Sequence, residues 1–203
     1  MCHRFLGLLA VQLGAAVWLA ACAGSPLPAV TWVRLPAEAP AAVAAPAPVP
    51  QVQGVWQLMA PVLLPGHLDR DALLVPQGAA GLQALGGARW AEPLRDAVPR
   101  LLRQDLAREF ATPVWLAPLP PGVLPTRQLR VEFTALDVSS DGRGVELRAR
   151  WSLADPKGAL PPTVFDAAFT SAAAGPGANE LAAAHRQAVA QLARRIADTA
   201  GTR

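Results

Sequence analysis

The chain has 203 residues, which is enough for one ordinary domain with a buried core. Its formal net charge is +3, and its 18 lysine and arginine residues are scattered among 15 acids without a basic block. This pattern, together with the lack of an aromatic-basic motif, excludes a nucleic-acid partner from our expectations. Both cysteines, Cys2 and Cys22, lie near the start, so the body of the chain holds no disulfide and must be stabilised by burial.

The N-terminal segment has the pattern of a secretory signal peptide. A short basic start precedes an apolar run over residues 5–18, and the sequence Leu19-Ala20-Ala21-Cys22 follows. This sequence, with cleavage between Ala21 and Cys22, resembles the lipobox of bacterial lipoproteins. The resemblance implies that residues 1–21 are removed, that the Cys22 thiol receives a diacylglycerol and that its amine receives an acyl chain.

Two other interpretations of this segment stay open: a transmembrane helix, and a plain signal peptide with a chance cysteine. A transmembrane helix needs about 20 apolar residues, which the run containing Gln12 barely reaches. On the lipoprotein interpretation, residues 22–28 form a lipidated tether and residues 29–203 form one domain. No later segment is long and apolar enough to span a bilayer, so the lipid is the expected membrane anchor.

The first element expected in the domain is a strand over residues 29–35, because of their β-branched and aromatic content. Residues 36–50 are almost entirely alanine and proline and cannot pack a core, so they are expected to be extended. If residues 29–35 join the sheet, this Ala/Pro-rich segment is a loop within the domain; otherwise everything before Gln51 is tether. The first alternative is favoured because Trp32 and Leu35 are unusual residues for a linker.

The next segments predict short strands separated by loops. Residues 52–64 alternate as a strand does, within limits set by Pro61 and Pro65, and residues 72–75 predict another strand. Residues 77–88 include four glycines but have neither a phosphate-loop nor a dinucleotide signature. We therefore expect residues 77–88 to be a flexible surface loop.

Two long helices are expected. The first covers residues 90–110, where Glu92 and Pro93 suit a helix start and Pro99 should kink the helix. The second covers residues 179–199. The apolar stripes that predict them are Leu94, Val98, Leu101, Leu102, Leu106 and Phe110 in the first, and Leu181, Ala184, Ala188, Leu192 and Ile196 in the second. Arg186, Arg194 and Arg195 are expected to lie away from the second stripe.

Period-two patterns between the helices predict an antiparallel meander. Residues 129–134 and 145–153 alternate clearly, a turn over residues 139–144 joins them, and residues 163–171 give a third strand. Residues 113–116 predict one more short strand. The expected fold class is α/β (α+β): a single domain with an antiparallel or mixed sheet and two main helices packed on one face.

Few residues suggest chemistry. His67, Asp69 and Asp71 would face one way on an extended chain and could hold a metal, but a solvated turn in which Arg70 pairs with one acid is the favoured alternative. No metal site is therefore predicted. His185 is expected to be a half-buried packing residue. The chain has no Gly-x-Ser-x-Gly motif, and no catalytic residue is predicted. By alternation, Trp56 and Trp151 are expected in the core.

Taken in order, several runs resemble one family. After the lipobox-like segment these runs are Pro61-Val62-Leu63-Leu64-Pro65, Leu68-Asp69-Arg70, Leu73-Leu74-Val75 and Arg89-Trp90-Ala91-Glu92-Pro93-Leu94. The sequence is similar to PqiC-type lipoproteins, the auxiliary lipoprotein component of MCE-protein and ABC-transport lipid systems. The likeness extends over nearly all of the mature chain; the Ala/Pro-rich segment and Pro99 depart from it.

The resemblance implies a non-enzymatic lipoprotein at the periplasmic face of the outer membrane. Its expected partners are an MCE-domain protein and inner-membrane transport components, with self-association into a homo-oligomer as a further option. It implies no cofactor other than the covalent N-acyl and S-diacylglycerol lipid on Cys22. Ala23 after the cysteine matches the outer-membrane sorting pattern.

Arg70, Trp90, Glu92 and Leu94 are the candidate partner surface on this interpretation; the alternative is that Trp90 and Leu94 only seat the helix on the sheet. Two functions other than that of a transport adaptor stay open. One is a periplasmic lipid-binding lipoprotein with its own apolar cavity between sheet and helices, and the other, ranked last, is a periplasmic hydrolase.

Overall fold

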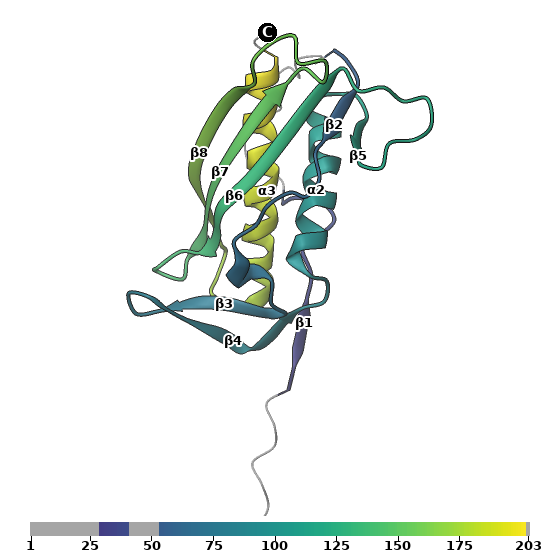
Figure 1. Ribbon diagram of the computed structural model, residues 1–203. Helices are drawn as coiled ribbons and strands as arrows, with labels where there is room; N and C mark the ends of the chain where they lie inside the picture. Colours follow the sequence, from purple (N-terminus) through teal and green to yellow (C-terminus); the bar gives the residue numbers. More distant parts are fainter. Residues whose placement is uncertain (1–28, 41–52, 202–203) are drawn as a thin grey trace, which may run out of the picture.

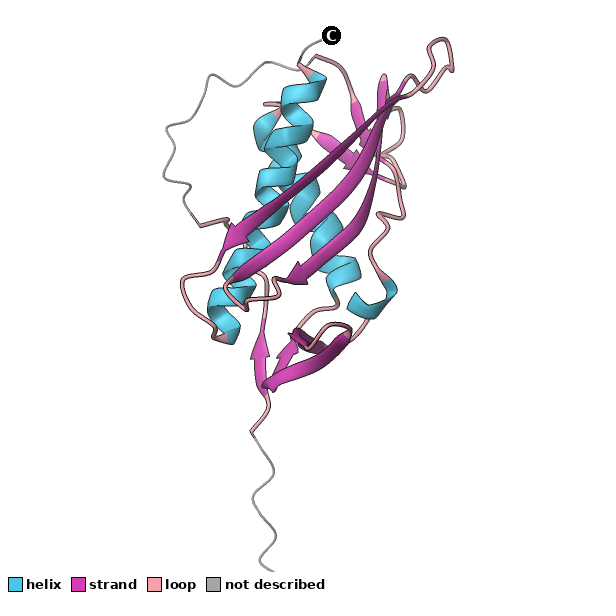
Figure 2. Ribbon diagram, turned by 90° about the vertical axis from the view of Figure 1, so that its left-hand side faces the viewer, coloured by secondary structure: helices cyan, strands magenta, loops and turns pink. Residues whose placement is uncertain are grey.

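A five-stranded sheet forms the larger layer of the computed structural model, which describes residues 29–40 and 53–201 (Figure 1). Its strand order is β5-β2-β6-β7-β8. The strands are β2 (Trp56–Leu58), β5 (Val114–Leu116), β6 (Arg127–Val138), β7 (Gly144–Ala154) and β8 (Thr163–Ala172). The helices α2 (Leu94–Glu109) and α3 (Ala178–Ala200) cover one face of this large sheet (Figures 1 and 2). The predicted mixed α/β class with two helices on one face is confirmed.

Strands β6, β7 and β8 form the predicted antiparallel meander. Their alternation places one set of side chains against the helices: Leu129, Val131, Leu147 and Trp151 are at most 2% exposed. The opposite face carries Arg130, Glu132, Arg148, Arg150 and Asp166, all exposed. An antiparallel sheet packed against helices usually has one face buried and the other exposed to solvent.

The first helix starts later than the sequence pattern suggested. Trp90 is the last residue of strand β4 (Gly81–Trp90), and α2 begins at Leu94, directly after Pro93. The prediction of a helix from residue 90 was wrong because the strand pairs with its neighbours up to Trp90, and a residue before proline disfavours the helical backbone. The helix then continues past Pro99 to Glu109. Its predicted apolar stripe is fully buried.

A second, three-stranded sheet was not predicted. It has the order β1-β4-β3, with β1 at Thr31–Val33 and β3 at Ala72–Gln77, and we call it the small sheet. The expected flexible loop at residues 77–88 is instead the turn and most of the second strand of this β3–β4 hairpin. Gly86 and Gly87 adopt positive φ where the β3–β4 register is irregular, so these glycines form a bulge in a strand rather than a loop.

The predicted strand at residues 29–35 joins this small sheet by parallel pairing of β1 with β4. Val33 and Leu35 are buried, whereas Trp32 is 61% exposed. The favoured interpretation of residues 29–35 as part of the domain is therefore confirmed. Of the Ala/Pro-rich segment 36–50, residues 41–50 lie outside the described part.

The predicted strand at residues 52–64 is shorter than expected. Only Trp56–Leu58 forms a strand, Leu63 makes an isolated bridge to Glu132, and residue 52 lies outside the described part. Pro61 and Pro65 interrupt the run because proline has no N–H for a sheet ladder. A short 3-10 helix, η2 (Gly66–Leu68), follows. Trp56 and Trp151 are both 2% exposed, which confirms their predicted core positions.

Among the described residues, no helix is long and apolar enough to cross a membrane. The small sheet lies at one end of the molecule, across the ends of the helices, and the C-terminus lies at the opposite end (Figure 1). The described chain begins at Ala29, immediately before β1. The domain is thus attached to its N-terminal segment at the small-sheet end.

Candidate functional site

The predicted anchor, Cys22, and the cleavage position at Ala21 lie outside the described residues. What the structure places is the point of attachment. Ala29 is seven positions after Cys22 in the sequence and directly precedes β1.

Trp90 marks the junction of the small sheet with the helices. Its backbone N–H donates to the Asp71 carbonyl at 2.5 Å, and its indole meets the His185 ring edge-on, with the centroids 5.4 Å apart. Trp90 is 5% exposed and Leu94 is 2% exposed. These two side chains fill the core, which favours the alternative that they seat the helix on the rest of the domain.

The other two residues of the candidate partner surface lie outside this core. Arg70 is exposed, and Glu92 is half-buried and accepts a hydrogen bond from Arg100 at 2.6 Å. Both lie in loops that flank the small sheet, one before β3 and one after β4. A partner that approaches this region would contact Arg70 and Glu92, with Trp90 and Leu94 supporting the segment from below.

The three side chains considered for a metal are directed to different partners. His67 Nε2 lies 2.5 Å from an Asp137 carboxylate oxygen, Asp69 pairs with Arg95, and Asp71 pairs with Arg89 at 2.8 Å. Within the described residues no group of three histidine, cysteine, aspartate or glutamate side chains is arranged to hold a metal ion. The acids are paired as in the favoured alternative, but Arg89 and Arg95 replace Arg70 as the partners.

His185 is more deeply buried than expected. It is 3% exposed, and its Nδ1–H donates to the Leu181 carbonyl at 2.8 Å. Burial lowers the pKa of His185 below its ordinary value, although the Leu181 hydrogen bond and the charge of Asp137 act in the opposite direction. A neutral, enclosed imidazole packed on Trp90 is a structural residue, so the predicted packing role is right and the half-buried position is wrong.

Arg186 corrects another prediction. It was expected to lie away from the buried stripe of α3, yet it is 0% exposed and forms a two-point ion pair with Asp105 of α2. The distances are 2.6 Å from Nη1 to Oδ2 and 2.7 Å from Nη2 to Oδ1. The prediction failed because α3 packs against the large sheet, against α2 and against residues 36–37, so it is buried around most of its circumference. The available signal was Asp105, an acid within the apolar stripe of the other helix.

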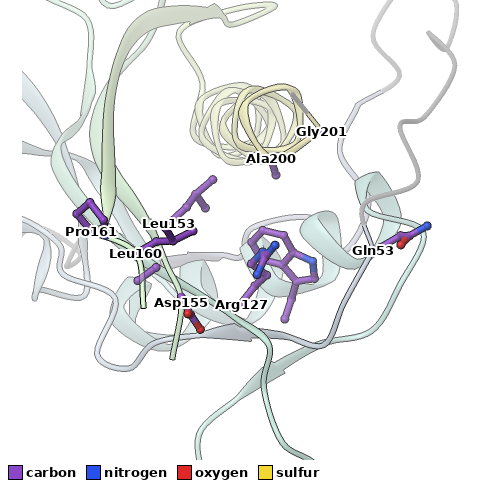
Figure 3. A pocket seen from close by; sticks show the side chains of 10 residues that line it. Gln53, Arg127, Leu153, Asp155, Leu160, Pro161, Ala200 and Gly201 are labelled. Carbon is purple, nitrogen blue, oxygen red and sulfur yellow. The ribbon is translucent and has the colours of Figure 1, made fainter. Parts of the chain in front are cut away.

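A hollow of about 470 Å³ lies at the end of the molecule opposite to the small sheet (Figure 3). Leu153 and Arg127, from the ends of β7 and β6, lie across it from Ala200 near the C-terminal end of α3. Trp56 also lines it, and the indole N–H of this buried residue has no hydrogen-bond partner in the described part of the chain. This volume is within the range of small-molecule sites.

The hollow does not occupy the position expected for a lipid cavity between sheet and helices. Side chains fill that layer, and those at 0% exposure include Leu58, Leu101, Leu129, Val145, Val189 and Leu192. The hollow is instead an opening at the strand ends. It is half polar in character, since Gln53, Arg127 and Asp155 line it together with Leu160 and Pro161.

A mixed α/β domain that follows a lipobox-like N-terminus is the arrangement of a lipoprotein with one globular body. The chain belongs to the family of ABC-type transport auxiliary lipoprotein components, whose family model matches residues 35–197. This membership confirms the resemblance to PqiC-type lipoproteins. The protein is therefore a transport auxiliary lipoprotein by family.

Two solved structures share the fold. One is a Xanthomonas campestris protein of the family DUF330, 17% identical, with a TM-score of 0.60 over 82% of this chain and 92% of that chain. The other is an uncharacterized protein, 19% identical, with a TM-score of 0.61 over 84% of this chain and 97% of that chain. No curated protein matches the sequence at a significant level.

Proposed function

We propose that this protein is the lipid-anchored adaptor of an ABC-type system that moves lipid between two membranes through an MCE-protein channel. In this role acylated Cys22 holds the domain at the periplasmic face of the outer membrane, and the domain docks the channel. The observation that carries the proposal is the family membership over residues 35–197, because the family is one of ABC-type transport auxiliary lipoproteins.

The proposed role is mechanical rather than catalytic. The polar side chains that were candidates for chemistry stabilise the fold instead: His67, Asp69 and Asp71 are paired with other residues, and His185 is buried. The helices and the large sheet pack on each other through fully buried leucines. A rigid body on a short tether suits an adaptor, which must hold a partner at a fixed distance from the membrane.

The tether sets that distance. Six residues lie between Cys22 and Ala29, and the seven steps from one Cα to the other reach at most about 25 Å when the chain is fully extended. Because Ala29 enters the small sheet, this end of the domain stays near the membrane. The large sheet and the C-terminal end of α3 extend away from the small sheet (Figure 1).

The anchor is tested by Cys22→Ser in the full-length protein, with Cys2→Ser as the matched control. Cys22→Ser should move the protein from the membrane fraction to the soluble periplasmic fraction, and the N-terminal peptide of the wild type should carry three acyl chains by mass spectrometry. Cys2→Ser should leave both results unchanged, because Cys2 belongs to the predicted signal peptide. A Cys22→Ser protein that stays in membranes would overturn the anchor.

Docking is tested by affinity purification with the MCE-domain protein encoded in the same organism. Arg70→Glu combined with Glu92→Arg reverses the two charges of the candidate partner surface and should abolish co-purification. Arg148→Glu, on the exposed face of the large sheet, is the control and should leave binding intact. If the double variant still binds, the docking face lies elsewhere; if the wild type binds no MCE-domain protein, the adaptor role is wrong.

A second candidate function is lipid binding, and the hollow beside Trp56 is the observation that favours it. A lipid head group there would meet the Arg127 guanidinium, and its acyl part would meet Leu153 and Leu160. The test is mass spectrometry of lipid extracted from the purified Cys22→Ser protein. One phospholipid per protein, lost in Leu153→Arg, would support this function over a pure adaptor; lipid-free protein would exclude it.

A further inference from the structure

Both faces of the small sheet are mostly apolar. Its inner face packs on the core through Val33, Leu73 and Trp90, with Val75 and Leu85 half-buried beside them. Its outer face follows from the register. Trp32 pairs with Arg89, Leu74 with Ala84, and Pro76 with Leu82, and paired residues point to the same side of a sheet. We call these six residues the outer face; all of them except Arg89 are apolar.

This outer face contrasts with the outer face of the large sheet. Arg130, Glu132, Arg148, Arg150 and Asp166 make the latter a solvated surface. On the small sheet, Trp32 is 61% exposed and Leu82 is 45% exposed. Arg89 on this side forms an ion pair with Asp71 at 2.8 Å, and Arg34, two residues after Trp32, is also exposed. An exposed sheet face made mostly of apolar side chains is a surface that something covers.

Its position identifies what covers it. Trp32 is ten residues after Cys22, and the small sheet is the part of the domain into which the tether runs. The lipid on Cys22 confines this end to within about 25 Å of the bilayer. Tryptophan favours the level of the lipid head groups, where its ring is partly buried and its N–H stays hydrated.

We infer that the outer face of the small sheet lies on the lipid bilayer, with Trp32 at the head-group level and Leu82 beside it. The inference rests on the proposed lipid anchor and adds an orientation to it. A tethered face needs little affinity of its own, because the anchor keeps its local concentration high. The contact fixes the orientation of the helices and the large sheet relative to the membrane. The domain therefore presents a defined surface to its partner.

The test uses the acylated mature protein in vesicles of phosphatidylethanolamine and phosphatidylglycerol, with and without brominated acyl chains. Brominated lipid should quench part of the tryptophan fluorescence of the wild type. Trp32→Phe should abolish this quenching. Trp115→Phe should preserve it, because Trp115 is also partly exposed but lies on β5 at the far end (Figure 1). The remaining tryptophans, Trp56, Trp90 and Trp151, are at most 5% exposed.

A second pair of variants tests the face without changing a tryptophan. Leu82→Asp should reduce the quenching. The control is Leu124→Asp, which should leave the quenching unchanged; Leu124 is 80% exposed in the loop before β6. Thermal unfolding of both variants shows whether the fold is retained. The acylation state is measured on the same samples by mass spectrometry.

The outcomes separate the inference from the proposed function. An acylated wild type whose fluorescence brominated lipid does not quench overturns the membrane contact and leaves the anchor standing. Cross-linking of the outer face to another protein or to a second copy has the same consequence, since the face is then a protein interface. An unacylated N-terminal peptide overturns the anchor, and the membrane contact with it.

Discussion

Arg186 of α3 and Asp105 of α2 form an ion pair through two nearly parallel contacts, with both side chains at most 2% exposed. Arg186 also donates from Nε to the Pro36 carbonyl at 3.1 Å and from Nη2 to the Ala37 carbonyl at 3.3 Å. A guanidinium presents several donors in a fixed plane, so it can satisfy a carboxylate and two carbonyls together. One side chain thereby joins both helices to the segment that leaves β1.

Removing one member of this pair should destabilise the domain strongly. Arg186→Met removes the buried partner of the Asp105 carboxylate and leaves it only the exposed Arg108. Breaking a buried ion pair typically costs about 3–5 kcal/mol in the free energy of unfolding. Urea denaturation measures this loss. The control is Arg194→Met, which removes a half-exposed pair with Glu109 and should cost no more than about 1 kcal/mol.

The double variant Arg186→Met, Asp105→Leu should recover much of that stability, since no buried charge is left unpaired. The segment at Pro36 should remain looser than in the wild type, because its carbonyls lose their donor. Limited proteolysis near residue 37 measures this separately. If the double variant is as unstable as Arg186→Met, the loss of stability does not come from the Asp105 carboxylate losing its buried partner.

Gly87 allows the chain before β1 to approach β4. Its φ is +79°, and a Cβ there would lie 3.0 Å from the Ala29 carbonyl oxygen. Gly87→Val should cost on the order of 1–3 kcal/mol through backbone strain and should also loosen β1. Hydrogen exchange at residues 31–33 measures the loosening. Gly78→Val is the control: it has a φ of +68° but open space around it, so equal exchange in both variants would contradict the contact.

Pro99 is the sixth residue of α2 and leaves the helix without one backbone hydrogen bond. Pro99→Ala should stabilise the domain, by up to about 3 kcal/mol from helix propensity. The measurement is the midpoint of thermal unfolding. Pro93→Ala, just before the helix, should change the midpoint little, because the missing N–H there would be unpaired in any case. A lower midpoint for Pro99→Ala would show that the core needs the proline ring.

His185 makes the stability depend on pH. Burial lowers its pKa in the folded state below the ordinary 6.5, so the unfolded chain takes up a proton more readily than the folded chain below that pH. The free energy of unfolding should therefore fall as the pH is lowered from about 6.5, by up to about 1.4 kcal/mol per unit, until the folded-state pKa is reached. Above 6.5 this contribution is constant.

Urea denaturation between about pH 7.5 and 5.5 measures the effect. His185→Phe keeps an aromatic ring beside Trp90 and removes the titration, so its stability should fall less steeply over this interval. An equal slope for His185→Phe and the wild type would assign the pH dependence to other groups.

The elements that the sequence predicted well are those whose pattern depends on one partner layer. The strands around Val131 and Leu147 alternate because one face meets the helices, and the stripe from Leu181 to Ile196 repeats because one side of that helix meets the sheet. Each of these repeats is a local property of the sequence. The meander, both helices and the class of fold could be predicted from them, whereas the family resemblance depends on short runs such as Trp90-Ala91-Glu92-Pro93-Leu94.

The small sheet could not be predicted in this way. Residues 77–88 have four glycines, and local preference favours a loop. They form a strand because β1 pairs with β4 although the two are separated by about fifty residues in the sequence, and because Leu85 reaches the core. The helix α2 starts later than predicted for the same reason: pairing of Trp90 with Val33 extends the strand to the residue at which the helix was predicted to begin.

By itself, the sequence determined the fold class and the expected lipid anchor, since the hydrophobic periodicity and the run Leu19-Ala20-Ala21-Cys22 are local properties. Only the tertiary structure decided which residues face outward. It buried Arg186 and His185, and it exposed Trp32, although side-chain type suggested a different distribution. Exposure depends on what packs against each side of an element, and those neighbours come from distant parts of the chain.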